Sequence, residues 1–147
     1  MKEYTVSCHV LNSNSGLPLS NILCELYTIT DENPIKIAKQ VTNKDGRVIK
    51  DTWEFLNDHK ISQNNTYMIR FQVKTSYYDI VKENTLYPYI DIPFMIKDTN
   101  VSHYHIPLLL NNFGYTTYRG SWFSYSFFFP ELKADTSLLG NKYMYCG

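Results

Sequence analysis

The sequence lacks the features that would place the protein in a membrane or on nucleic acid. No apolar run approaches the ~20 residues that a helix needs to cross a bilayer. Fourteen basic residues balance fourteen acidic ones, whereas nucleic-acid-binding proteins normally carry an excess of positive charge. We therefore expect neither a membrane nor a nucleic acid as a partner.

Cysteine is also scarce. Cys8, Cys24 and Cys146 are odd in number, lie far apart and form no CxxC pair, so they indicate neither a disulfide framework nor a zinc site. The opening residues, MKEYTVSCHVLN, turn polar too early for a secretory signal. These absences predict a cytoplasmic protein with buried or idle thiols, and they leave a peroxisomal location open.

What the chain does contain predicts a β-domain. With 147 residues, of which 44% are hydrophobic, it can build one core. Short segments alternate apolar and polar residues more often than they show helical periodicity, and turn signals such as Asp45-Gly46 separate them. The pattern predicts an all-β fold, an antiparallel β-sandwich of seven or eight strands, with one short helix at residues 76–83.

The composition changes at Ser121. Beyond it, the run WFSYSFFF has strong β-propensity and no charge. We therefore place a domain at residues 1–121 and an aromatic-rich C-terminal extension of unknown structure at residues 122–147. Three alternatives stay open for this extension: it covers an exposed apolar surface, it partly blocks a site, or it is a coding artefact.

Histidines are the first candidates for chemistry. His103 and His105 lie two apart on a predicted strand and therefore share a face, and His9 shares its face with Leu11. An H-x-H pair of this kind occurs in the metal sites of cupin-like sandwiches. Those sites also need an acidic ligand, and the positions after His105 are apolar. We therefore expect no metal, and we assign no role to His59, which lies in a predicted loop.

Arginine is rarer than lysine, with three residues against eleven: Arg47, Arg70 and Arg119. A guanidinium offers a planar fork of donors that matches a flat, oxygen-rich partner. Arg47 follows the tight KDG turn, and Arg119 lies in a terminal Tyr-Arg-Gly-Ser motif. Neutral imidazoles, a guanidinium and a phenol suit the hydrolysis of a small anionic heterocycle, although ordinary surface arginines remain an alternative on these grounds alone.

Four segments in a fixed order carry a family pattern: CHVLNSNSGLPLSNI, VTNKDGR, HYHIPLLL and FGYTTYRGS. Together they resemble the 5-hydroxyisourate hydrolases of the transthyretin fold, over roughly residues 4–121. The resemblance implies a two-sheet sandwich that assembles as a homotetramer, a dimer of dimers with a central channel. It also implies a cofactor-free hydrolase in urate degradation that opens an oxidised purine, 5-hydroxyisourate, to 2-oxo-4-hydroxy-4-carboxy-5-ureidoimidazoline.

The same resemblance implies the site residues. By position, His9, Arg47 and His105 match the family's catalytic residues, and Tyr118 and Ser121 lie in its terminal signature. The two histidines are then expected to activate water and Arg47 to hold the ring. Tyr118 and Ser121 are expected to contact the substrate together with His9 and Arg47.

Two departures and one rival accompany this interpretation. Asn12 stands where the family usually has Asp, and Asn can make similar turn-stabilising bonds. The chain also continues past the signature with which the family typically ends. His103 lies nearer the loop than His105, so we assign it a structural role. The rival is a non-catalytic carrier of small ligands with the same fold, or an inactive relative, and the carrier lacks this combination of histidines, arginine and terminal signature.

Overall fold

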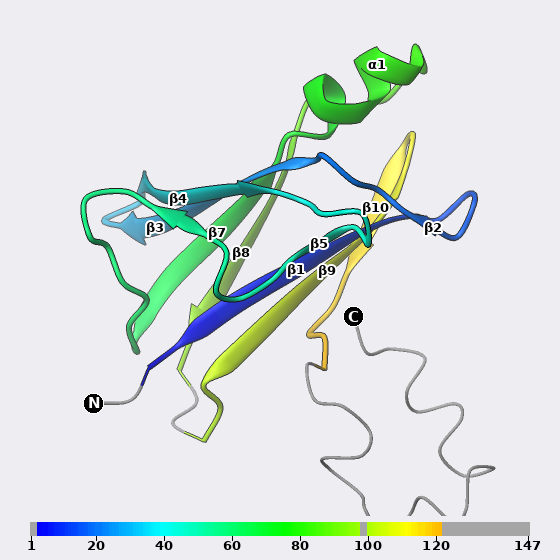
Figure 1. Cartoon of the computed structure of the whole chain (residues 1–147). Coiled ribbons are helices and arrows are strands. Elements are labelled where there is room, and N and C mark those ends of the chain that lie inside the picture. The colour runs from blue at the N-terminus through cyan, green and yellow to red at the C-terminus, as the bar shows by residue number, and fades with distance from the viewer. Residues whose placement is uncertain (1–2, 98–99, 122–147) are drawn as a thin grey trace, which may run out of the picture.

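The computed structural model describes residues 3–97 and 100–121. Two β-sheets lie face to face, and one helical segment projects at an end of the sandwich (Figure 1). The first sheet contains β1 (Thr5–Asn12), β2 (Leu17–Pro18), β5 (Arg47–Val48), β9 (His103–Asn111) and β10 (Gly114–Thr117). The second contains β3 (Leu23–Thr30), β4 (Asn33–Val41), β6 (Glu54–Phe55), β7 (Asn65–Phe71) and β8 (Ile90–Ile96).

The predicted all-β sandwich is confirmed. Seven of the strands in the described residues are four residues or longer, and β2, β5 and β6 have two residues each. β6 lies within a stretch that the sequence pattern predicts as loop, because two residues are too few to show an alternation. The predicted short helix corresponds to a π-helical turn, η1 (Lys74–Tyr78), that continues into α1 (Asp79–Val81).

The period of two in β1 separates the core from the outer surface. Val6, Cys8 and Val10 are fully buried between the sheets, and the alternate residues point away from the core. Burying such apolar side chains contributes roughly 1.5–3 kcal/mol for each large one. The register of β1 is therefore strongly specified, since a slip by one residue would put its polar side chains into the core.

One strand pair runs against the predicted antiparallel pattern. β1 and β9 pair in parallel, with Thr5 opposite His103 and Ser7 opposite His105, whereas the other ladders between named strands of the described chain are antiparallel. The chain between β1 and β9 passes through the second sheet, so no hairpin forces the two strands into opposite directions. Figure 1 shows β1 and β9 side by side along the sheet.

Other expectations concern single residues. The Oδ1 atom of Asn12 accepts a hydrogen bond from the Asn14 backbone N–H at 2.9 Å, which confirms that Asn serves at this turn. Cys8 and Cys24 are buried free thiols with their Sγ atoms 3.8 Å apart. Cys146 and the extension at residues 122–147 lie outside the described residues. No helix in the described part of the chain is long and apolar enough to cross a membrane.

Candidate active site

β1 and β9 place their polar side chains on one outer face of the first sheet. On β9, Tyr104, Ile106 and Leu108 are buried in the core, so His103 and His105 point outward. The same alternation puts Ser7 and His9 on the outer face of β1, next to the two histidines. A small area of the sheet thus holds three imidazoles from two strands that are nearly 100 positions apart in the sequence.

A tight turn brings a guanidinium to this face. The Asn43 Oδ1 atom accepts hydrogen bonds from the backbone N–H groups of Asp45 at 2.9 Å and Arg47 at 3.0 Å. Gly46 has a φ of +75°, and a Cβ there would lie 2.6 Å from a carbonyl oxygen of β1, so only glycine fits. β5 then pairs with β1 so that Arg47 lies directly opposite His9. The register therefore brings together two of the residues that the sequence predicts as site residues.

His9 is half-buried and stays neutral. Burial lowers its pKa, and the charge of Arg47 lowers it further, whereas a hydrogen bond from the ring to the backbone carbonyl of Asp45 acts in the opposite direction. A neutral imidazole next to a guanidinium can accept a proton at neutral pH. Among the described residues Arg47 forms no ion pair with a carboxylate, so its charge is available to an anionic ligand.

His105 is the most enclosed of the three imidazoles, with 2% of its surface exposed. Its Nδ1 atom lies 2.6 Å from the Ser7 Oγ atom, and its Nε2 atom is buried with no hydrogen-bond partner among the described residues. Burial lowers the pKa of His105 to about 3, with smaller contributions from Arg47, His9 and His103. A buried polar atom without a partner is costly, so Nε2 is a natural contact point for a ligand or water.

His103 is linked to His105 through Ser7. The Ser7 Oγ atom lies 2.8 Å from His103 Nε2, and the Thr5 Oγ1 atom lies 2.6 Å from His103 Nδ1. Burial is the main cause that lowers the pKa of His103 to about 4, followed by the charge of Lys50. The sequence assigns a structural role to His103 and no role to Ser7 and Thr5. Their spacing could have indicated one, because they lie two and four residues before His9 and therefore on the same face of β1 as His9.

The terminal signature folds back onto His105. The Gly120 backbone N–H donates a hydrogen bond to the His105 carbonyl at 3.0 Å, and a Cβ on Gly120 would collide with the imidazole ring. The Arg119 guanidinium lies over the ring of the core residue Tyr104, with its Cζ atom 5.4 Å from the ring centre. Tyr118 is 37% exposed, and Ser121 is exposed at the end of the described chain. The substrate contacts predicted for these last two residues stay a prediction.

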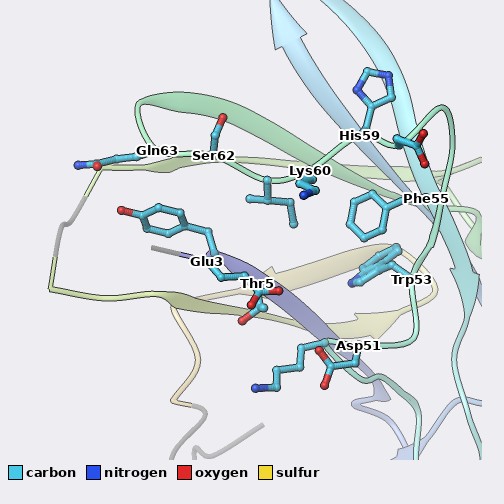
Figure 2. A pocket seen from close by; sticks show the side chains of 13 residues that line it. Glu3, Thr5, Asp51, Trp53, Phe55, His59, Lys60, Ser62 and Gln63 are labelled. Atoms are coloured by element: carbon cyan, nitrogen blue, oxygen red, sulfur yellow. The ribbon is translucent and has the colours of Figure 1, made fainter. Parts of the chain in front are cut away.

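A cavity of about 860 Å³ lies at the end of the sandwich where β1 begins. Figure 2 shows Thr5 on the β1 side, with the rings of Trp53 and Phe55 close by and Asp51 near Thr5. His9, Arg47 and His105 do not line this cavity, whereas His59, to which the sequence assigns no role, does. The described residues include no group of three or more His, Cys, Asp or Glu side chains that could hold a metal ion.

Comparison with known proteins shows the family to which the chain belongs. The model of the HIUase/Transthyretin family matches residues 6–120. The chain belongs to the HIUase/Transthyretin family. The family match spans β1, the turn before Arg47, and β9, and it ends one residue before Ser121. It therefore includes four of the five predicted site residues.

Individual members of the family are similar over most of the chain. The 5-hydroxyisourate hydrolase of Halalkalibacterium halodurans is 37% identical over 120 residues, covering 79% of this chain and 97% of that protein. The solved 5-hydroxyisourate hydrolase of Klebsiella pneumoniae is 25% identical, with a TM-score of 0.63 over 80% of this chain and 99% of that one. Sea bream transthyretin in complex with thyroxine, with 21% identity and a TM-score of 0.66, covers 78% of this chain and 92% of its own and shares the fold.

Proposed function

We propose that this member of the HIUase/Transthyretin family is a 5-hydroxyisourate hydrolase. It opens the ring of 5-hydroxyisourate to give 2-oxo-4-hydroxy-4-carboxy-5-ureidoimidazoline, a step of urate degradation in purine catabolism. The observation that carries the proposal is the placement of two neutral imidazoles and one guanidinium on a single outer face, with His9 directly opposite Arg47. Relatives named for the same activity support it.

The chemistry needs a proton acceptor for the attacking water. His9 and His105 are the candidates, because burial lowers the pKa of each and keeps it in the neutral form that can accept a proton. A positioned general base contributes roughly 10²–10⁴-fold to the rate. The unpartnered Nε2 atom of His105 is the acceptor that the geometry favours.

The substrate is a flat ring with several carbonyl oxygens, so it also needs a matching cation. Arg47 supplies a planar fork that can bind the ring and stabilise charge that develops on oxygen as water attacks a ring carbonyl. Orientation and proton transfer suffice for such an electrophilic ring, so the proposal includes no metal or organic cofactor. Tyr118 and Ser121, in the segment that folds back next to His105, are proposed to contact the substrate together with His9 and Arg47.

A homotetramer, a dimer of dimers, completes the proposal. In the single chain His9 and Arg47 lie on an outer face, and the large cavity is elsewhere. A second copy packed over this face would turn it into a channel wall and exclude bulk water.

We further propose a cytoplasmic location, with a peroxisomal one still open. We also propose a catalytic domain at residues 1–121 and a separate extension at residues 122–147.

The test uses the stereochemistry of the product. Uncatalysed ring opening gives a racemate, so a hydrolase is expected to form one enantiomer, which circular dichroism detects. His9→Ala and Arg47→Lys are each expected to lower kcat/KM by about 10²-fold or more, once spontaneous decay is subtracted.

Arg70→Lys is the matched control. This arginine lies on the second sheet, where its guanidinium binds Asp91 through two hydrogen bonds of 2.8 and 2.9 Å, so activity should be unchanged. A racemic product from the wild-type protein, combined with tight binding of a fluorescent thyroid-hormone analogue, would instead identify a carrier.

A further inference from the structure

Four side chains form an unbroken hydrogen-bonded row from His105 to the cavity. The row is His105 Nδ1, Ser7 Oγ, the two ring nitrogens of His103 and Thr5 Oγ1, with successive distances of 2.6, 2.8 and 2.6 Å. Thr5 lines the cavity (Figure 2). The parallel register of β1 and β9, which sets Ser7 opposite His105 and Thr5 opposite His103, creates this row.

We propose that Ser7, His103 and Thr5 form a proton path between His105 and the cavity, and that this path sets which ring nitrogen of His105 carries the proton. The inference rests on the hydrolase function proposed for the same site. In it Ser7, His103 and Thr5 are positioning residues, because they act through His105 and not on the substrate.

The row permits two proton arrangements. In the first, His105 donates its Nδ1–H to Ser7, Ser7 donates its hydroxyl hydrogen to His103 Nε2, and His103 donates its Nδ1–H to Thr5. The Nε2 atom of His105 then bears a lone pair. In the second arrangement every hydrogen bond is reversed, and His105 carries its hydrogen on Nε2. Each imidazole is neutral in both.

A switch between the two arrangements lets His105 take up a proton at Nε2 while the row releases one at Thr5, so that His105 stays neutral during the reaction. When water attacks the ring carbonyl, its O–H bond breaks and the proton goes to His105 Nε2. The Nδ1 proton of His105 moves to Ser7, one proton moves on through His103, and Thr5 releases its hydroxyl proton to water in the cavity. When the ring C–N bond breaks, His105 Nε2 gives its proton to the leaving nitrogen. The row then reverses by taking one proton back at Thr5.

The surroundings explain why a path is needed. A charged His105 would be buried next to Arg47 of β5 and His9 of β1, and a charged His103 would lie near Lys50. Among the charged groups of the described residues that act on His103, Asp51, which lines the cavity together with Thr5, has the opposing charge. Accumulating an imidazolium in this row is therefore unfavourable, and the depressed pKa values of both histidines agree with that. The cavity end carries mixed charges, from Glu3, Lys50, Asp51, Asp58 and Lys60, together with His59.

The first experiment interrupts the row in the full-length protein. Ser7→Ala is expected to lower kcat by about 10–100-fold with KM changed less than about twofold, within what a correctly protonated general base supplies. The dependence of kcat on the fraction of D₂O should change from curved, as several protons move together in the wild type, to linear. Ser7→Thr keeps the hydroxyl group and should restore most of kcat and the curvature.

Ser13→Ala is the matched control. The Ser13 hydroxyl also joins the β1 end to β9, through a 3.2 Å hydrogen bond to the Leu110 carbonyl, but it contacts no histidine. This variant should behave like the wild type. Should Ser7→Ala fail to fold, Thr5→Val interrupts the row at its half-buried end and is expected to give the same linear D₂O dependence.

A second measurement does not depend on activity. The ¹⁵N resonances of the His105 ring are expected to show one tautomer in the wild type, with Nε2 unprotonated, and a mixture or the opposite tautomer in Ser7→Ala. An inert wild-type protein that still shows this change would refute the hydrolase and leave the tautomer control intact. An active wild type whose Ser7→Ala variant keeps its kcat, D₂O curvature and His105 tautomer would overturn the proton path alone.

Discussion

Replacing Gly120 by alanine tests how closely the terminal signature fits the site. A Cβ at this position would lie within 3.0 Å of the His105 Cδ2 atom, and 3.1 Å from both the His105 carbonyl oxygen and the Pro107 Cγ atom. Two of these three contacts involve the His105 residue itself, which is held between Gly120 and Ser7. The ring or the segment after β10 must therefore move when the methyl group is added.

The size of the effect follows from that displacement. Overpacking of a tight contact costs typically about 1–3 kcal/mol, and the lower entropy of an unfolded chain with alanine offsets about 0.4–1 kcal/mol of it. We expect a net loss of about 1–2 kcal/mol in the free energy of unfolding. Because ordinary contact requires the ring to shift by roughly 1 Å, kcat/KM should fall by about 10²-fold.

Urea denaturation and the ring-opening assay measure the two quantities. Gly114→Ala, at the start of β10, is the control, because its Cβ would meet nothing closer than the Asn111 side chain at 3.4 Å, an ordinary contact. That variant should keep both stability and activity. If Gly120→Ala had the urea midpoint and kcat/KM of the wild type, the close fit of the signature against His105 would be wrong.

Two further predictions concern acid stability and the domain boundary. Because the folded pKa of His105 is about 3, the unfolded chain binds a proton as the pH falls below 6.5 while the folded chain does not. The free energy of unfolding therefore decreases as the pH falls below 6.5, by about 2 kcal/mol at pH 5, since each pH unit corresponds to about 1.36 kcal/mol. Urea titrations at several pH values should show a weaker dependence of this free energy on pH for His105→Asn than for the wild type. The same pH dependence in both proteins would contradict the low pKa of His105. A chain truncated after Ser121 is expected to fold and stay active, because residues 3–121 already form both sheets with a packed apolar core between them. Loss of cooperative thermal unfolding in the truncated chain would refute the boundary.

Much of the site was within reach of the sequence. Alternation on β1 and β9 predicts that His9 points away from the core and that His103 shares a face with His105, and the structure agrees. The Asn-Lys-Asp-Gly turn predicts a tight bend before Arg47, which the positive φ of Gly46 confirms. Local patterns can do this because side-chain direction and turn geometry depend on neighbouring residues.

Other features were not within reach. The sequence assigns a structural role to His103 and overlooks Ser7, because a single serine on a strand carries no chemical signal of its own. The depth at which His105 is buried depends on Gly120, fifteen positions later, folding back over it. The alternation of short segments also could not predict that β1 and β9 run parallel, because nothing in either strand encodes the direction of its partner.

The sequence by itself determined the class of fold, the face on which each candidate side chain lies, and the family to which the chain belongs. Only the tertiary structure decided which of those side chains become neighbours. Alternation within a strand sets only the side to which a residue points, whereas the register between strands almost 100 residues apart is set by the packing of the whole sandwich. That register sets Ser7 opposite His105 and His9 opposite Arg47, and from those two pairings the proposed chemistry follows.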